Sequence, residues 1–109
     1  MATYTNISYV AKNVGTSAST LVTVSASTTA AVASLVVANT SVSPITCDVY
    51  FTRSAVDYYL VKTATVPVGG SLVIVGGDQK VVLEPTDVLL VVTSAATSAD
   101  VVCSLLEIA

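Results

Sequence analysis

The sequence predicts an all-β protein, an antiparallel β-sandwich of jelly-roll type with eight or nine short strands. Valine and threonine supply 22 and 15 of the 109 residues, and their β-branched side chains favour strands over helices. Turn-forming residues recur at intervals of about 8 to 12 residues, which is the spacing typical of sandwiches and barrels. No long segment has helical periodicity. A chain of this length encloses one core, so we expect a single domain over residues 1–109.

The first third of the chain contains three candidate strands. Thr5–Val14 ends at Gly15, a short strand follows at Thr20–Val24, and the third, Ala30–Ala38, stops where Asn, Thr, Ser and Pro cluster in residues 39–44. These residue types form turns by local hydrogen bonding or by fixing φ. Two interpretations of residues 1–19 stay open: an edge strand of the sandwich, or an extended arm that reaches a neighbouring molecule.

The middle of the chain contains the clearest strand signal, at Ile45–Arg53. Apolar residues occupy every second position from Ile45 to Phe51, which is the period of a half-buried strand. Ser54–Asp57 then predicts a four-residue hairpin loop, and Tyr58–Val66 predicts the returning strand of the same hairpin.

Glycine and proline divide the last third into short strands. Pro67–Gly70 and Gly76–Gln79 are turns that flank a strand at Ser71–Val75, and Glu84–Asp87 contains a proline, which cannot donate a ladder hydrogen bond. Val88–Thr93 shows no alternation, which favours a central strand covered on both faces. The remaining candidate strands are Lys80–Leu83 and Val101–Ile108.

Composition and charge exclude several classes of partner. The longest apolar run, Val88–Val92, is far shorter than the roughly 20 residues of a membrane-spanning helix, so we expect no membrane partner. Four cationic residues and a net charge of −3 provide no basic surface for nucleic acid. The first residues lack the basic leader and apolar core of a signal peptide, so we expect synthesis in the cytoplasm. In that reducing compartment Cys47 and Cys103 are expected to be buried thiols; a disulfide formed later in an oxidising medium is the alternative.

No catalytic or metal-binding pattern is present in the sequence. The chain has no histidine, which removes the usual general base and the commonest transition-metal ligand. Two cysteines are too few for a structural zinc site, and the seven acidic residues are scattered singly. The glycine pairs do not precede the residues of a phosphate-binding loop. We therefore expect no enzymatic activity, no cofactor and no metal.

Tyrosines are the remaining candidates for function. Tyrosine offers a broad apolar surface with a polar tip and is enriched at protein interfaces. The alternatives are that these rings close the end of the sandwich, or that Tyr50, Tyr58 and Tyr59 form a stacking platform in a carbohydrate- or receptor-binding module. The candidate interface residues are Tyr4, Tyr9, Tyr50, Tyr58 and Tyr59.

From Ala30 onward the order of short motifs resembles small β-sandwich virion structural proteins of tailed bacteriophages, including cyanophage-like capsid decoration, neck and tail proteins. The family-like glycine of the Pro-Gly-Asp turn is Thr86 here, which is a departure from the pattern. The matching segments are Val36–Thr40, Asp57–Lys62, Val66–Leu72, Lys80–Leu89 and Val101–Ile108.

This resemblance implies a sandwich without activity that is located on the virion. The leading hypothesis is a capsid decoration (cement) protein that binds the major capsid protein and further copies of itself, and so forms a homo-oligomer. A neck, tail or fibre-associated protein is the alternative within the same class. Because only 10% of the residues in the chain are charged, its surface is poorly protected against association, which suits a protein of an assembly.

Overall fold

The computed structural model describes residues 3–77 and 79–109, which contain nine β-strands and no helix. The expected all-β class is therefore confirmed. No helix in this described part is long and apolar enough to cross a membrane. The strands are β1 (Tyr4–Val14), β2 (Ser19–Thr23), β3 (Thr29–Asn39), β4 (Ile45–Arg53), β5 (Val56–Val66), β6 (Ser71–Val75), β7 (Val81–Leu83), β8 (Val88–Thr93) and β9 (Ala99–Ile108).

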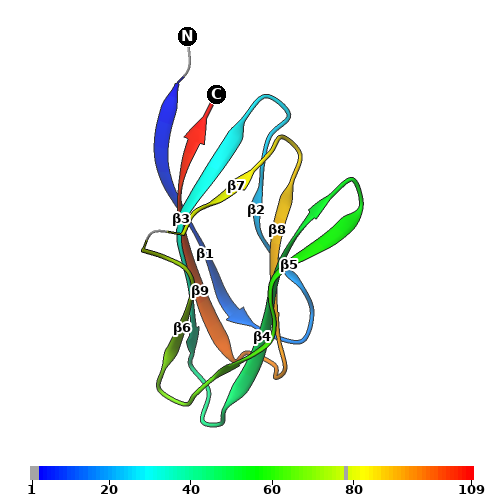
Figure 1. Cartoon of the computed structure of the whole chain (residues 1–109). Coiled ribbons are helices and arrows are strands. Elements are labelled where there is room, and N and C mark those ends of the chain that lie inside the picture. Colours follow the sequence, from blue (N-terminus) through cyan, green and yellow to red (C-terminus); the bar gives the residue numbers. More distant parts are fainter. Residues whose placement is uncertain (1–2, 78) are drawn as a thin grey trace.

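The strands form two antiparallel sheets that pack face to face (Figure 1). A five-stranded sheet has the order β1-β9-β3-β6, with β7 also paired to β3, and a four-stranded sheet has the order β2-β8-β4-β5. Because β6 and β7 pair with successive parts of β3, they act as one interrupted strand. With that strand counted once, every connection except the β4–β5 hairpin crosses from one sheet to the other, as in an eight-stranded jelly roll.

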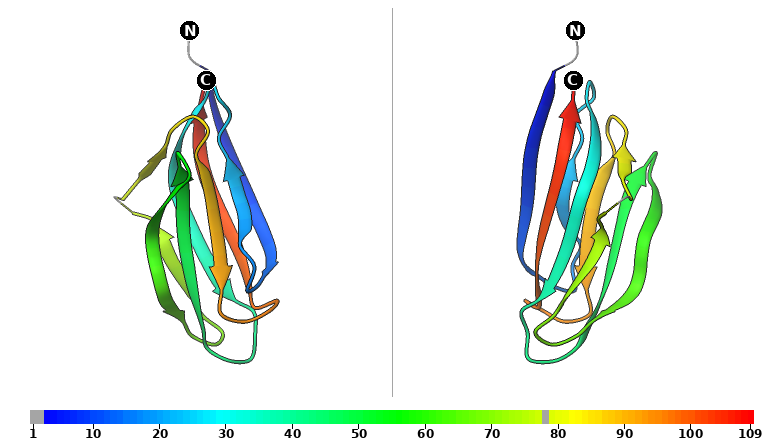
Figure 2. Two further views of the ribbon diagram at one scale, coloured as in Figure 1. Left: turned by 90° about the vertical axis from the view of Figure 1, so that its right-hand side faces the viewer. Right: turned by 60° about the vertical axis from the view of Figure 1, so that its left-hand side comes forward.

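The last strand of the chain lies inside the five-stranded sheet. β9 pairs with β1 from Tyr4–Ile108 to Ala11–Val101 without interruption, and its other edge pairs with β3. β1 is thus the strand at one edge of this sheet (Figure 2). Residues 4–14 lie within the sandwich as an edge strand.

The core fills the space between the two sheets with aliphatic side chains. β8 buries the alternate residues Leu89 and Val91, and β3 buries Val32, Leu35 and Val37, with a register shift after Val32 that displaces the alternation by one residue. Burial of apolar area contributes about 25 cal/mol per Å² and supplies the main driving force for folding.

Both cysteines belong to this core. Cys47 is 1% exposed and Cys103 is 0% exposed, and neither forms a disulfide. Burial raises the pKa of Cys103 to about 11, and burial also raises the pKa of Cys47. Because the thiolate is the reactive form, these thiols act as small apolar side chains, which confirms the prediction of two buried thiols.

The β4–β5 hairpin is tighter than the sequence predicted. Arg53 pairs with Val56, so the loop consists of Ser54 and Ala55 alone, and the prediction of a four-residue loop is wrong. Both loop residues have positive φ, 54° and 62°, as the twist-compatible two-residue turns of hairpins require. Glycine and asparagine usually occupy such positions, and their absence hides the turn in the sequence.

The prediction that both faces of β8 are covered is also wrong. β8 is an inner strand between β2 and β4, but Leu89 and Val91 are buried while Val88, Leu90 and Val92 remain partly exposed. Among the described elements, none covers the outer face of the four-stranded sheet in Figure 2. A continuous apolar run therefore places one row of side chains in the core and a second row on the surface.

Thr86 occupies a position that favours glycine. The turns Pro67–Gly70 and Glu84–Asp87 are each closed by a hydrogen bond from the fourth residue to the first. Their third residues, Gly69 and Thr86, have φ values of 70° and 71°. Glycine adopts this conformation freely, whereas a β-branched residue is strained there.

Replacing Thr86 with glycine is expected to raise the free energy of unfolding by about 1 kcal/mol, because release of backbone strain exceeds the added entropy of the unfolded chain. The hydrogen bond from the Thr86 N–H to the Val24 carbonyl is retained. Urea denaturation measures the change. Thr65→Gly, at an exposed position within β5, serves as the control and should destabilise. A loss of stability in both variants would contradict the strain at Thr86.

Candidate interaction surfaces

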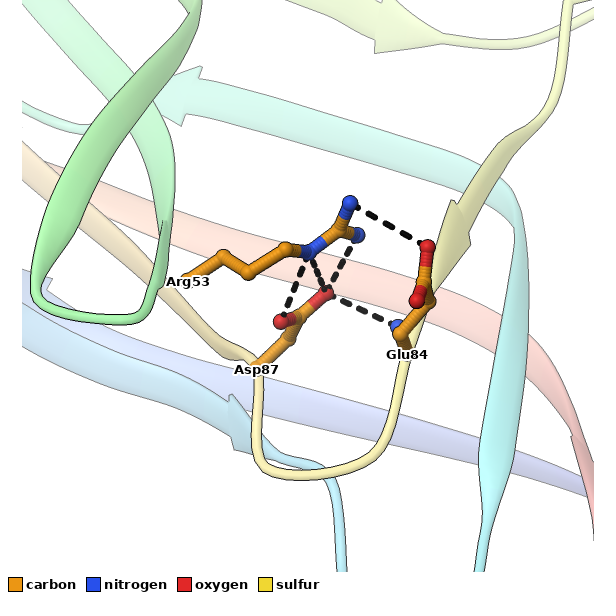
Figure 3. Close-up of polar contacts among 3 residues, drawn as sticks. All are labelled: Arg53, Glu84 and Asp87. Atoms are coloured by element: carbon orange, nitrogen blue, oxygen red, sulfur yellow. Dashed lines mark hydrogen bonds and ion pairs between the residues drawn. The ribbon is translucent and has the colours of Figure 1, made fainter.

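The best-connected charged cluster joins Arg53, Glu84 and Asp87 (Figure 3). Arg53 ends β4, whereas Glu84 follows β7 and Asp87 precedes β8. The Arg53 guanidinium donates from Nε to both carboxylate oxygens of Asp87 at 3.1 Å and from Nη2 to Oδ2 at 2.7 Å. The Glu84 N–H donates to the same Oδ2 at 2.8 Å. The cluster therefore connects the β4–β5 hairpin with the turn between the two sheets.

The Asp87 carboxylate is occupied by protein donors. Its hydrogen bonds to Arg53, and secondarily the N–H of Glu84, hold the pKa of Asp87 below its usual range although burial opposes this shift. Asp87 is 1% exposed, so no ligand can reach its oxygen atoms without displacing Arg53. The backbone of Asp87 also pairs with Val24, after β2. This cluster holds the turn in place and is not a binding site.

Other buried polar side chains also connect loops. Asn39 donates from Nδ2 to the carbonyls of Ser43 and Val66, and the hydroxyls of Thr93 and Ser98 lie 2.7 Å apart beside the carbonyl of Val14. Among residues 3–77 and 79–109, every buried side-chain nitrogen or oxygen has a hydrogen-bond partner. Within the same residues no three His, Cys, Asp or Glu side chains are grouped to hold a metal ion.

Tyr50 and Tyr59 lie together on the outer face of the four-stranded sheet. They are cross-strand partners, and their ring centroids are 5.0 Å apart. The Lys62 ammonium group lies 4.4 Å from the centroid of the Tyr59 ring, a favourable cation–π geometry. Partial desolvation, with Asp57 as the next cause, raises the pKa of Tyr50.

The remaining candidate tyrosines lie elsewhere. Tyr58 stacks on Phe51 at 5.4 Å, and because neighbouring strand residues point to opposite faces, its ring is on the other side of the sheet from Tyr59. Tyr50, Tyr58 and Tyr59 therefore do not form one stacking platform. Tyr9 is partly buried and donates to Glu107 Oε2 at 3.1 Å. Tyr4, near the start of β1, is 65% exposed.

A row of four valines crosses the outer face of the five-stranded sheet. Val10 pairs with Val102, Val102 with Val36, and Val36 with Val73. Val10, Val102 and Val73 are 72%, 48% and 60% exposed. We call these residues the valine row. An apolar row of this kind on a sheet surface marks a site of contact with another molecule more often than scattered apolar residues do.

The surroundings of the valine row carry little charge. In the described strands of this sheet the charged residues are Lys12, Asp100 and Glu107. Lys12 and Asp100 form an ion pair at 3.0 Å, and Glu107 accepts the hydrogen bond from Tyr9. Since charged residues are depleted from the centres of protein interfaces, this face fits an interface better than a permanently solvated surface.

An open hollow of about 430 Å³ lies beside the valine row, where small residues replace larger ones. Its lining contains no charged side chain, and its hydroxyls come from Ser8 and Ser104. Enzyme and cofactor sites normally combine an enclosed pocket with convergent titratable groups. This hollow is open, and no titratable side chain lines it. The lining residues are Asn6, Ile7, Ser8, Ala33, Ser104, Leu105 and Leu106.

Comparison with known proteins identifies the fold. No family model matches the chain, and no curated protein matches its sequence. The structure is similar to a chain in the acidic stable capsid structure of Helicobacter pylori bacteriophage KHP30, with a TM-score of 0.60, 12% identity, and coverage of 100% of this chain and 94% of that chain. It is also similar to a chain of the Bacillus endospore appendages, a family of disulfide-linked pili, with a TM-score of 0.53, 14% identity, and coverage of 97% and 86%. At these identities the similarity shows a shared fold.

Proposed function

We propose that this protein is a non-enzymatic structural component of a tailed-phage virion, a capsid decoration protein that stabilises the shell by binding the major capsid protein and further copies of itself. The observation that carries the proposal is the valine row, an exposed apolar strip across a sheet with few charges. Such a surface is suited to cohesion between proteins and supplies no catalytic group.

Two further observations support this proposal. One structural neighbour that spans the whole chain comes from a phage capsid, and the second comes from a pilus, so the same fold occurs in two large protein assemblies. The ordered motifs from Ala30 onward resemble phage virion proteins. Arg53, the cation with the most contacts to acidic groups, is committed to Asp87 and Glu84 inside the fold, which leaves little positive charge for packaged DNA.

The mechanism is cohesion through many moderate contacts. A standard interface buries about 800 Å² on each partner, and apolar burial contributes about 25 cal/mol per Å² before the cost of association. The affinity of each single interface can therefore be modest. When many copies bind neighbouring sites on one shell, multivalency makes their combined attachment strong.

Copy number distinguishes decoration from a neck, tail or fibre role. A decoration protein is expected at on the order of hundreds of copies per particle, because it repeats with the capsid lattice, whereas tail and neck parts occur in few or dozens. The copy number is measured from the ratio of this protein to the major capsid protein on a gel of purified virions. A low ratio would support the tail or neck alternative, and absence from the particles would refute the virion role.

A charge in the valine row tests the proposed surface. Val102→Lys places an ammonium group at an exposed inner position of the row, and it is expected to reduce the amount of protein bound to undecorated particles by at least about tenfold. Thr65→Lys adds the same charge at an exposed site in the other sheet and should bind normally. Circular dichroism shows that both variants fold. Equal binding of both variants would remove the valine row from the mechanism.

A further inference from the structure

The free edge of β1 differs from the other sheet edges. Among the described strands β1 forms a ladder with β9 alone, and the register of this ladder is regular from Tyr4 to Ala11. Among the other described edge strands, β2, β6 and β7 have five residues or fewer. The long edge strand β5 pairs irregularly with β4 and carries Asp57 and Lys62. β1 is therefore the long, regular edge in the described part of the chain.

Every second residue of β1 offers its backbone to a new partner. Thr3 and Ala109 exchange two backbone hydrogen bonds, and in an antiparallel ladder such pairs recur at alternate residues. The N–H and C=O groups of Tyr4, Asn6, Ser8 and Val10 consequently point away from β9, and all four residues are exposed. No proline and no charged residue lies in residues 4–10, although edge strands are commonly protected by these residue types.

We infer that β1 binds β1 of a second copy of this chain in an antiparallel pair, with the two-fold axis at Ile7. This register opposes Tyr4 to Val10 and Asn6 to Ser8 of the second copy. All four residues have free backbone groups, so each of these pairs can exchange two hydrogen bonds. The inference deepens the proposed function and rests on it, because it names the surface through which copies of the protein cohere.

The side chains select this register over its neighbours. Tyr4 and Val10 are 65% and 72% exposed, and the register packs each against the other in both halves of the dimer. Aromatic and β-branched side chains form favourable cross-strand pairs. A shift by two residues would instead place Tyr4 opposite Ser8 or Lys12. Lys12 already forms an ion pair with Asp100, which makes the second of these shifts unfavourable.

The paired strands would join two five-stranded sheets into one. The valine row ends at Val10 on this edge, and in the dimer it continues onto Tyr4 of the second copy. The strip of apolar side chains thus becomes longer, and the backbone groups of the edge no longer face water. Strand addition of this kind combines main-chain hydrogen bonds, which supply affinity, with side-chain pairs, which supply specificity.

The first test uses hydrogen exchange and sedimentation of the isolated full chain. At high protein concentration the wild type is expected to sediment as a dimer, and the amides of Ser8 and Val10 should exchange as slowly as those of Ile7 and Tyr9, which bond to β9. On dilution the amides of Ser8 and Val10 should become fast while the other two stay protected. A monomer at every concentration would overturn the inference. So would exchange rates of the Ser8 and Val10 amides that do not change on dilution.

Substitutions then test the edge itself. Ser8→Pro removes an N–H that faces solvent in the monomer, so the fold tolerates it, and dimer formation should weaken by at least about tenfold. Ser8→Ala keeps the N–H and should dimerise normally. Equal dimerisation of these two variants would show that β1 is not the contact.

A pair of double variants with exchanged charges separates a loss of dimerisation from a loss of folding. Tyr4→Lys with Val10→Lys places like charges opposite each other and should abolish the dimer, whereas Tyr4→Lys with Val10→Glu should restore it. Equal dimerisation of the two double variants would refute the register centred on Ile7.

The copy number of the protein on the particle is measured independently of its dimerisation. Dimers of a protein that is absent from virions would refute the virion function alone, and abundant particle-bound protein that never dimerises would refute the β1 pairing alone.

Discussion

Replacing Asp87 with alanine is expected to lower the free energy of unfolding by about 3 kcal/mol, because the change leaves the Glu84 N–H and the Arg53 guanidinium without their acceptor. The carboxylate is 1% exposed and accepts from both groups. Urea denaturation at pH 7, followed by circular dichroism, measures the loss.

Glu84→Ala is the matched control for Asp87→Ala. Its carboxylate also pairs with Arg53, at 3.2 Å, but is 61% exposed, and exposed ion pairs contribute less than about 1 kcal/mol. If the two variants lost equal stability, Asp87 would not hold the turn between β7 and β8 in the way that the geometry indicates.

The Asp87 carboxylate also makes the free energy of unfolding depend on pH in acid. Since Arg53 lowers the pKa of Asp87 in the folded state, the contribution is complete above the pKa of the unfolded chain, about 3.9, and is lost as pH falls through the folded pKa. Asp100, whose pKa is lowered by the Asn13 N–H and by Lys12, acts in the same direction. Asp87→Asn should therefore lose less stability between pH 6 and pH 2 than the wild type does. Equal acid sensitivity would contradict the role of Asp87.

Leu89→Ala is expected to destabilise the protein by about 3 kcal/mol, since it removes buried methyl groups and leaves a cavity between the sheets. Leu89 is 0% exposed and lies opposite Phe51 of β4. The neighbouring residue of the same type provides the control, because Leu90 points to the outer face of the sheet. Leu90→Ala should cost less than about 1 kcal/mol.

Chemical denaturation of both variants tests the register of β8. A slip of one residue exchanges the two faces of a strand, so a larger loss for Leu90→Ala than for Leu89→Ala would mean that β8 presents the opposite set of side chains to the core. Equal losses would indicate that the outer face is covered in solution, for example by another copy of the protein.

Strand bounds were predictable where turn residues flank a strand. Ile45–Arg53, Ser71–Val75 and Val88–Thr93 were expected with the bounds that the structure has, because proline, glycine or an acidic turn lies beside each one. The Ser54–Ala55 turn was missed because neither residue signals positive φ. The exposed face of β8 was missed because a continuous apolar run has no period that separates its two faces.

The candidate surfaces were harder to predict because they depend on long-range register. The valine row joins residues from four strands, and Val10 and Val102 meet only because β9 pairs with β1. The alternation of apolar residues from Ile45 to Phe51 leaves Tyr50 on the opposite face of β4, but it gives no information on the pairing of Tyr50 with Tyr59. Arg53 and Asp87 are 34 positions apart, and their contact requires the complete sandwich.

The position of β9 between β1 and β3 has a consequence for the timing of synthesis. Because β9 follows β1 and β3 in the sequence, the larger sheet lacks its middle strand until β9 has been synthesised. Contacts between such distant segments also form slowly once the chain is free, because the closure of long loops must come first. Until β9 inserts, β1 has no strand with which to pair. Unpaired strands of this kind are prone to aggregate, so the larger sheet is protected only once β9 has paired with both β1 and β3.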